Sequence, residues 1–219
     1  AVRWKIKDLV AFSADDAVID TIDIPEQANQ SRRPMVYAVA AKSDAVQRQV
    51  ELVGDAGLKL DAIDIPEMCL HNIAGCLPQA EAGVAFLHFA EKVGTLVLSR
   101  GGLLYLIRRI DTGLEAIRQT CSGALSTGDA VSEIALELQR SLDYFESHYD
   151  QRPITNIVLA PGAPPEFSGL LAEQLGIGVS VLDLNELLSA SEPIPADMQP
   201  LVLTAIGAAL RQPAGEVAA

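Results

Sequence analysis

Two residue types in this chain, histidine and cysteine, could bind metals or act as nucleophiles, and their spacing predicts neither chemistry. The chain of 219 residues has three of each: His71, His88 and His148, and Cys69, Cys76 and Cys121. No pair has the spacing of a zinc-binding motif, and an odd number of cysteines does not suggest a disulfide framework. We therefore expect no metal centre, and we expect the cysteines to be small buried side chains.

The carboxylates do not predict a nuclease or a nucleic-acid-binding protein. Within residues 83–109 the only acid is Glu91, so the paired carboxylates of a two-metal nuclease site are absent. The net charge is −13, and residues 160–219 contain seven acids against the single base Arg211. Such a surface repels a phosphate backbone, whereas a basic protein segment would be attracted to it.

The elements that must position any site follow from the apolar pattern of the second half of the chain. Apolar runs at 83–89, 95–99 and 103–109 predict three antiparallel strands, and Gly101 and Gly102 permit a tight turn between the last two. Alternating helices and strands are predicted to follow: helix 131–145, strand 154–160, helix 167–175, strand 178–182 and a last helix with Met198, Leu201, Val202, Ala205, Ile206 and Ala209 on one face. This order is typical of the ribonuclease-H-like α/β topology from which actin-like ATPases are built.

The first part of the chain has a different pattern of apolar residues. Residues 18–24 and 35–41 predict two strands, and residues 43–57 predict a helix with Val46, Val50 and Val53 facing inward. A third strand is expected at 58–65, before a helix that begins at Pro66. We place the main boundary at 78–83, which gives a domain of residues 1–80, a second of residues 81–212 and a flexible tail of residues 213–219.

The amino-terminal residues do not resemble a secretory signal. Trp4 lies among Arg3, Lys5 and Lys7, and no apolar run approaches the roughly 18 to 20 residues that span a bilayer. We therefore expect a soluble cytoplasmic protein.

Several short motifs, in this order, resemble the PilM family of type IV pilus assembly proteins, and among them the MshI proteins of the mannose-sensitive haemagglutinin (MSHA) pilus. The motifs are Arg-Trp-Lys-Ile-Lys-Asp at 3–8, Ala-Gly-Leu at 56–58 leading to Ile-Asp-Ile at 63–65, Asn72, and the run 137–146. The resemblance covers about residues 1–211. It implies an actin-like ATPase fold, similar to FtsA, in which the β-β-α-β unit before Pro66 is a small inserted subdomain.

The resemblance also identifies the positions that would bind nucleotide. The family's first glycine-rich phosphate hairpin has no counterpart here, and since the sequence begins without Met we expect that an amino-terminal part of the fold is missing. In the second phosphate turn His88 replaces an aspartate and Ala90 a glycine, which leaves the hydroxyl of Thr95. A neutral imidazole is a poor ligand for Mg²⁺.

The adenosine-binding turn is altered as well. Residues 160–165 read Ala-Pro-Gly-Ala-Pro-Pro, which keeps one glycine and adds prolines without a backbone donor. We therefore expect no ATPase activity and no bound cofactor, and only weak ATP binding through Gly162, Ala163 and Thr95.

By resemblance, the protein is expected to be a scaffold of the pilus platform, peripheral to the inner membrane, that binds the cytoplasmic tail of a PilN-like protein. The strands 18–24 and 35–41 would receive that tail, with Tyr37 and Val39 as contacts. Two alternatives remain open: an ATP-switched component of the same machinery, and the cytoplasmic domain of a type II secretion platform protein.

Overall fold

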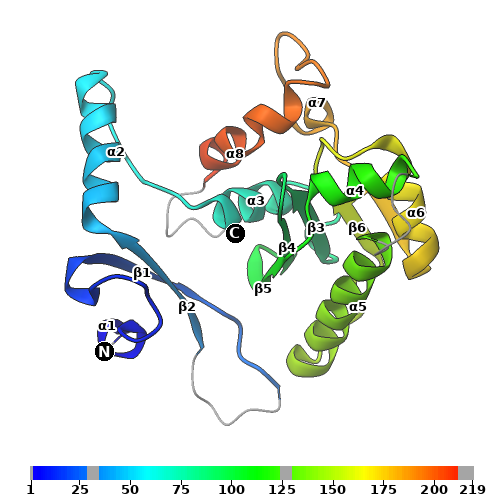
Figure 1. Ribbon diagram of the computed structural model, residues 1–219, viewed down its shortest axis with the longest axis horizontal. Coiled ribbons are helices and arrows are strands. Elements are labelled where there is room, and N and C mark those ends of the chain that lie inside the picture. Colours follow the sequence, from blue (N-terminus) through cyan, green and yellow to red (C-terminus); the bar gives the residue numbers. More distant parts are fainter. Residues whose placement is uncertain (1, 29–34, 124–129, 212–219) are drawn as a thin grey trace. The chain divides into compact units, whose positions relative to one another are not determined.

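The computed structural model describes residues 2–28, 35–123 and 130–211, which form two compact units. In the described part of the chain, residues 2–26 and 35–64 make up the first unit, and residues 27–28 and 65–211 the second (Figure 1). The division falls between Asp64 and Ile65, earlier than the expected 78–83, because the helix that begins at Pro66 packs within the second unit. The assignment of residues 1–80 to half of an actin-like fold stays a prediction, and the tail 213–219 lies outside the described residues.

The first unit is built on a two-stranded sheet. Its elements are α1 (Val2–Ile6), a 3-10 turn (Ala14–Asp16), β1 (Ala17–Asp23), β2 (Val36–Lys42) and α2 (Ser43–Asp55). The strands are antiparallel, with Ala17 opposite Lys42 and Asp23 opposite Val36. Both predicted strands and the helix are therefore confirmed.

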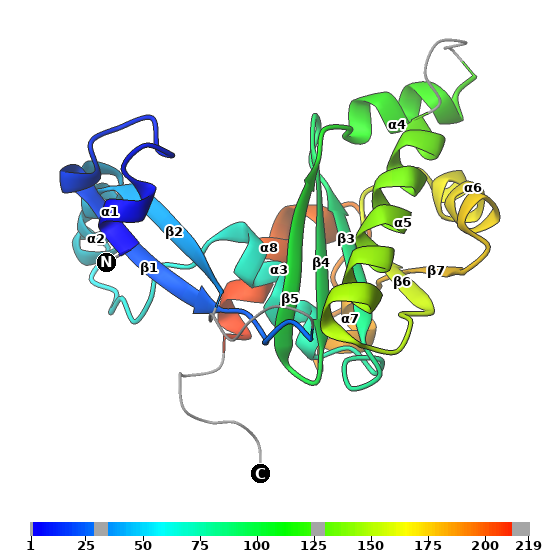
Figure 2. The ribbon, with the colours of Figure 1, turned by 90° about the horizontal axis from the view of Figure 1, so that it is seen from below.

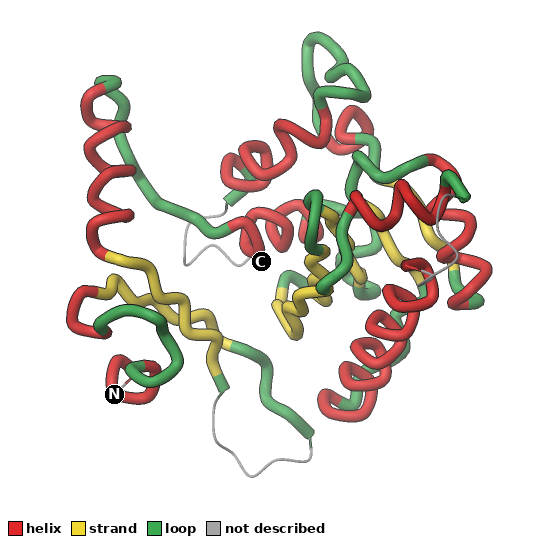
Figure 3. Tube along the Cα trace, in the orientation of Figure 1, coloured by secondary structure: helices red, strands yellow, loops and turns green. Residues whose placement is uncertain are grey.

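The third strand expected at 58–65 is wrong. These residues form a loop (Figure 3), and Leu58 and Ile63 are 67% and 46% exposed. An apolar segment becomes a strand only where a neighbouring edge supplies hydrogen bonds, and neither β1 nor β2 pairs with this one. The predicted β-β-α-β unit is thus β-β-α in the described residues.

Little of the first unit is buried. Ile6 and Ala17 are its only buried apolar side chains among the described residues, and α2 buries none. Of the valines expected to face inward, Val46 and Val53 are half-buried and Val50 is exposed. An isolated two-stranded sheet is marginally stable in water, so this unit depends on further apolar contacts.

The second unit contains a five-stranded sheet in the order β5-β4-β3-β6-β7. The strands are β3 (Val84–Phe89), β4 (Gly94–Arg100), β5 (Leu103–Ile110), β6 (Asn156–Leu159) and β7 (Gly178–Val181). The first three form the predicted antiparallel meander, and β6 joins parallel to β3 as expected. Gly101 and Gly102 have φ angles of 54° and 73°, so both residues of the tight turn use the left-handed conformation that glycine favours.

Helices cover both faces of this sheet. They are α3 (Pro66–Gly75), α4 (Leu114–Cys121), α5 (Ala130–Tyr149), α6 (Pro165–Leu175), α7 (Leu184–Leu187) and α8 (Gln199–Ala209). Figure 2 shows α3 and α8 on one face and α5 and α6 on the other. Phe86, Phe145 and Phe167 are fully buried between these layers. None of the described helices has the length and apolarity needed to cross a bilayer.

The face of α8 that carries the predicted apolar residues is not the buried face. Leu201 is 74% exposed, whereas Gln199, Leu203 and Gly207 are buried. A Cβ atom at position 207 would lie 2.3 Å from the carbonyl oxygen of Cys69, so α8 approaches α3 through a glycine. Asn72 fastens this contact by donating from Nδ2 to the carbonyl oxygen of Gly207 over 2.9 Å.

The expectation of buried cysteines holds for one of the three. None of the three forms a disulfide with a described residue; Cys69 is buried in α3, Cys121 is half-buried and Cys76 is exposed. Cys76 is exposed because it lies at the carboxyl end of α3, beyond the last buried turn.

Arg100, at the end of β4, joins three segments of the second unit. Its guanidinium donates to the carbonyl oxygens of Ala82 and Arg152 and to Oε1 of Gln151, over 2.8 to 2.9 Å. It also lies 5.2 Å from the ring centroid of Phe145. Hydrogen bonds from a charged donor to backbone oxygens are individually modest, but three from one side chain fix its surroundings.

Replacing Arg100 with alanine should lower the free energy of unfolding by about 2 to 3 kcal/mol, because several acceptors lose their donor at once. Arg109→Ala is the matched control, since that side chain is 69% exposed and, among the described residues, forms an ion pair with Asp111 alone. Urea denaturation of both variants tests the difference, and equal midpoints would contradict the role given to Arg100.

Candidate functional site

The carboxyl ends of β3, β5, β6 and β7 lie at one edge of the five-stranded sheet. This follows from their directions, because β3 and β5 each run antiparallel to β4, and β6 and β7 run parallel to β3. Ligands of open α/β sheets bind at this edge. It carries the turn 90–93, the loop 111–113 and the loop 160–164, so both turns expected to bind nucleotide are found here.

The turn between β3 and β4 is tight, and Ala90, Glu91 and Lys92 in it are exposed. His88 lies opposite Thr95 and Phe89 opposite Gly94, and Ala90 N–H donates to the carbonyl oxygen of Val93 over 2.8 Å. Burial lowers the pKa of His88, so the imidazole is neutral at neutral pH. A neutral imidazole at this position offers no charge or oxygen ligand to a magnesium ion.

This turn is fastened to the first turn of α4. The N–H groups of Leu114 and Glu115 donate to the carbonyl oxygens of Ala90 and Glu91 over 2.9 and 3.0 Å. Position 113 has no room for a side chain, because a Cβ atom there would lie 2.4 Å from the carbonyl carbon of Lys92. The amides of a helix amino terminus are natural anion ligands, and two of those of α4 are used by the turn.

An ion pair reinforces the same contact. The guanidinium of Arg118 on α4 binds both carboxylate oxygens of Glu91, over 2.8 and 3.0 Å. The hydrogen bond from Arg118 lowers the pKa of Glu91. Both side chains are largely exposed, so the pair fixes geometry more than it adds stability.

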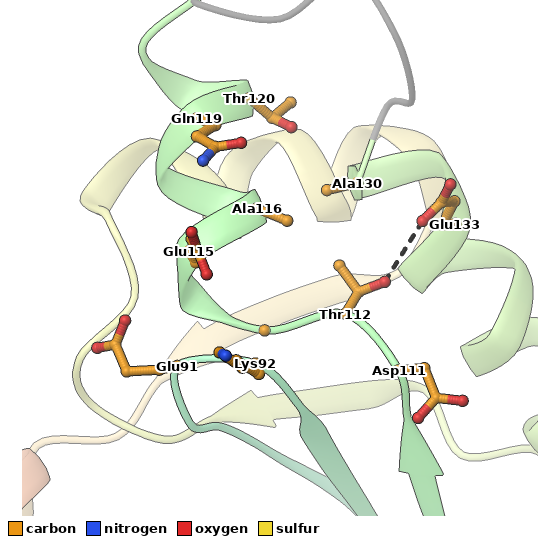
Figure 4. Close-up of a pocket in the computed structure, with 11 residues that line it drawn as sticks. Glu91, Lys92, Asp111, Thr112, Glu115, Ala116, Gln119, Thr120, Ala130 and Glu133 are labelled. Carbon is orange, nitrogen blue, oxygen red and sulfur yellow. Dashed lines mark hydrogen bonds between the residues drawn. The ribbon is translucent and has the colours of Figure 1, made fainter.

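A pocket of about 380 Å³ lies between this turn, α4 and α5 (Figure 4). Its lining includes four carboxylates and one cation: Glu91, Asp111, Glu115, Glu133 and Lys92. Inside it, Thr112 Oγ1 donates to Oε2 of Glu133 over 3.3 Å. A lining with this excess of acids repels a triphosphate. Within the described ranges, no group of three or more His, Cys, Asp or Glu residues could hold a metal ion.

The loop after β6 has few free backbone donors. Ala160 N–H donates to the carbonyl oxygen of Leu87 over 2.8 Å, and three of the next five residues are prolines. Gly162 has a φ angle of 117°, and a Cβ atom there would lie 3.2 Å from Cγ of Pro200. Gly162 and Ala163 therefore supply the remaining N–H groups of this loop.

The predicted nucleotide residues come from two segments of the same sheet edge. Thr95 is on β4, in the strand pair that carries the turn, while Gly162 and Ala163 follow β6. None of the three lines the acidic pocket. Their role in nucleotide binding stays a prediction.

The features that fasten the turn to α4, Gly113 and the Glu91–Arg118 pair, were not identified from the sequence. The sequence feature that could have indicated this contact is the glycine directly before the helix that follows the meander.

The predicted partner contacts lie in the first unit. Tyr37 is opposite Ile22 and Val39 is opposite Asp20, so the four side chains share one face of the two-stranded sheet. Tyr37, Val39 and Ile22 are half-buried and Asp20 is exposed. The contact role of Tyr37 and Val39 stays a prediction.

Comparison with known proteins gives structural neighbours only. No protein family and no curated protein matches the sequence. A chain of the PilM-PilN type IV pilus biogenesis complex is 20% identical and superposes with a TM-score of 0.66, over 95% of this chain and 70% of that one. The chain has an actin-like ATPase fold. The expected α/β fold class is thereby confirmed, with a mixed five-stranded sheet at its centre.

Weaker likenesses involve further solved structures. The ethanolamine utilization protein EutJ from Carboxydothermus hydrogenoformans is 17% identical, with a TM-score of 0.49 over 75% of this chain and 60% of that one. A protein of actin-like ATPase fold and unknown function from Bacteroides thetaiotaomicron is 11% identical, with a TM-score of 0.44 over 92% of this chain and 63% of that one.

Gly113→Ala should destabilise the protein by about 1 to 3 kcal/mol, because the added Cβ forces the turn away from α4. Gly169→Ala is the matched control. Position 169 is inside α6 with nothing within 4 Å of an added Cβ, so that variant should be stabilised by about 0.5 to 1 kcal/mol. Chemical denaturation measures both changes. A Gly113→Ala variant as stable as the parent protein would contradict the close contact.

His88 should make stability depend on pH. Its folded pKa lies below the ordinary value of 6.5, so the unfolded chain binds the proton first as the pH falls. The free energy of unfolding should therefore decrease as the pH falls from 7 through 6.5, and it should level off below the pKa of His88 in the folded protein. His88→Gln should flatten this part of the curve of unfolding free energy against pH. An unchanged slope in the variant would show that His88 is not the group responsible.

Proposed function

We propose that this protein is a non-catalytic scaffold of a type IV pilus assembly platform, which binds the cytoplasmic tail of a PilN-like inner-membrane protein. The observation that supports the proposal most is the fold shared with a chain of the PilM-PilN complex over 95% of this chain. The sequence motifs further suggest an MshI-like component of an MSHA-type pilus. In this role the protein is cytoplasmic and peripheral to the inner membrane.

The first unit has the properties of a surface that is completed by a partner. Among its described residues it buries almost no apolar side chain, and Val18, which shares the face of Tyr37 and Val39, is 46% exposed. The face that holds Tyr37 and Val39 is only half-buried. A tail bound along this face would cover apolar surface that the unit does not cover itself, and a tyrosine is a favourable anchor for such a contact.

The groups at the carboxyl ends of the sheet strands favour a scaffold that binds a partner over an enzyme that hydrolyses ATP. Two amides at the amino terminus of α4, which could otherwise bind phosphate, donate to carbonyl oxygens of the β3–β4 turn, and the pocket beside this turn is lined by four carboxylates. The loop at Gly162 and Ala163 favours the alternative of an ATP-switched component, because the N–H groups of these two residues donate to no other backbone group in the described part of the chain. A direct titration with nucleotide separates the two functions.

Calorimetric titration with Mg-ATP should show no binding tighter than about 100 μM, equivalent to roughly −5.5 kcal/mol. The reason is that carboxylates line the pocket beside the β3–β4 turn and repel a triphosphate, while the loop after β6 offers only the amides of Gly162 and Ala163. Micromolar affinity would refute the scaffold proposal and favour the ATP-switched component.

Tyr37→Asp should weaken binding of a synthetic PilN-type tail peptide at least about tenfold, because a carboxylate at the contact must be desolvated. Ala38→Asp is the matched control. Ala38 is exposed on the same strand and faces the opposite side of the sheet, so the same charge should leave binding unchanged. Fluorescence anisotropy measures the affinity, and circular dichroism checks that both variants fold. Equal affinity of the two variants would mean that the tail does not bind at Tyr37.

A further inference from the structure

The outermost strand β7 of the five-stranded sheet has one side that is not paired with another described strand. β7 pairs with β6 and with no other described strand. Leu182 N–H donates to the carbonyl oxygen of Leu159, and backbone groups alternate in direction along a strand, so those of Ser180 also point toward β6. The N–H and C=O groups of Val179 and Val181 therefore point outward, and no described residue bonds to them.

The sequence of β7 does nothing to block pairing with another strand. Exposed edges are usually protected by charged side chains or proline, and β7 reads Gly-Val-Ser-Val with Val181 53% exposed. The opposite edge strand, β5, carries Arg108, which pairs with Glu137, and Arg109. An edge with free backbone groups and no charge fits a short extended peptide, which would add a strand.

A pocket beside this edge would receive a side chain of such a peptide. It has a volume of about 210 Å³, and Val158 and Ser180, which lie opposite each other, contribute to its lining. A strand added to β7 continues the row formed by these two residues, so its residue opposite Ser180 faces the same pocket. The remaining walls include Leu77, Leu187 and the polar residues Gln79 and Glu186.

The polar groups of the pocket specify a basic side chain. Oε1 of Gln79 is buried without a hydrogen-bond partner in the described part of the chain, so it can accept from a donor that the protein does not supply. Glu186 adds a negative charge at the same pocket. A lysine or arginine fits both, because its aliphatic stem can lie against Leu77 and Leu187 while its head meets the two acceptors.

The charge of the surrounding chain points to the same kind of partner. Residues 160–211 contain six acids and the single base Arg211, and the whole chain carries −13. Two copies of this chain would repel each other at β7. We propose that the β7 edge binds an extended basic segment of a partner protein, which adds a strand to the sheet and places one lysine or arginine in the pocket lined by Gln79 and Glu186.

The test uses the full chain and three synthetic peptides of equal length: alternating Lys and Val, alternating Glu and Val, and the Lys-Val peptide with its central valine replaced by proline. Amide NMR spectra should show that the Lys-Val peptide shifts Val179, Ser180 and Val181 together with the side-chain amide of Gln79. The other two peptides should leave these signals unchanged.

Two variants and a control locate the interaction. Val179→Pro removes an outward N–H without removing a bond to β6, and Glu186→Lys reverses a charge on an exposed residue; each should weaken binding about fivefold. Val179→Thr keeps the N–H and should bind like the parent protein.

Four results would overturn the proposal. They are no saturable binding of the Lys-Val peptide, shifts confined to other acidic surfaces, unchanged affinity in both weakening variants, and a dimer of the free protein that Val179→Pro dissociates, which would make a second copy the occupant.

Discussion

The backbone contact between the β3–β4 turn and the first turn of α4 determines what the edge of the sheet can bind. Two carbonyl oxygens of the turn accept the amides of Leu114 and Glu115, and Gly113 permits the approach because it has no side chain. Groups that could otherwise surround an anion are thereby used within the protein. The carboxylates beside the turn, with one of them held by Arg118, then make the adjacent pocket acidic.

The two units differ in how much of their stability they supply themselves. The second unit buries aromatic and aliphatic side chains on both faces of its sheet, and Arg100 ties β4 to the segments at 82 and 151–152. The first unit buries only Ile6 and Ala17 among its described apolar residues. The free energy available from covering its apolar face is therefore large compared with its own core, which suits a surface that a partner peptide completes.

The sequence was most informative where structure is local. Apolar runs and the Gly101-Gly102 turn predicted the meander because register and turn geometry depend on neighbouring residues. The strand expected at 58–65 failed because a strand needs an edge to pair with, which periodicity does not reveal. The face of α8 failed because Gly207 packs closely on Cys69, whereas hydrophobicity favoured Leu201. The contact between Glu91 and Arg118 joins residues 27 apart, and no local pattern encodes it.

Hydrogen exchange of the Leu114 and Glu115 amides tests most directly whether the turn is a fixed structural element. If α4 holds the turn as described, both amides exchange as slowly as those of the buried strand β3, and millimolar Mg-ATP leaves their rates unchanged. Rapid exchange of these two amides in the free protein, or a change in their rates on addition of Mg-ATP, would contradict this account and show that the edge remains available to nucleotide.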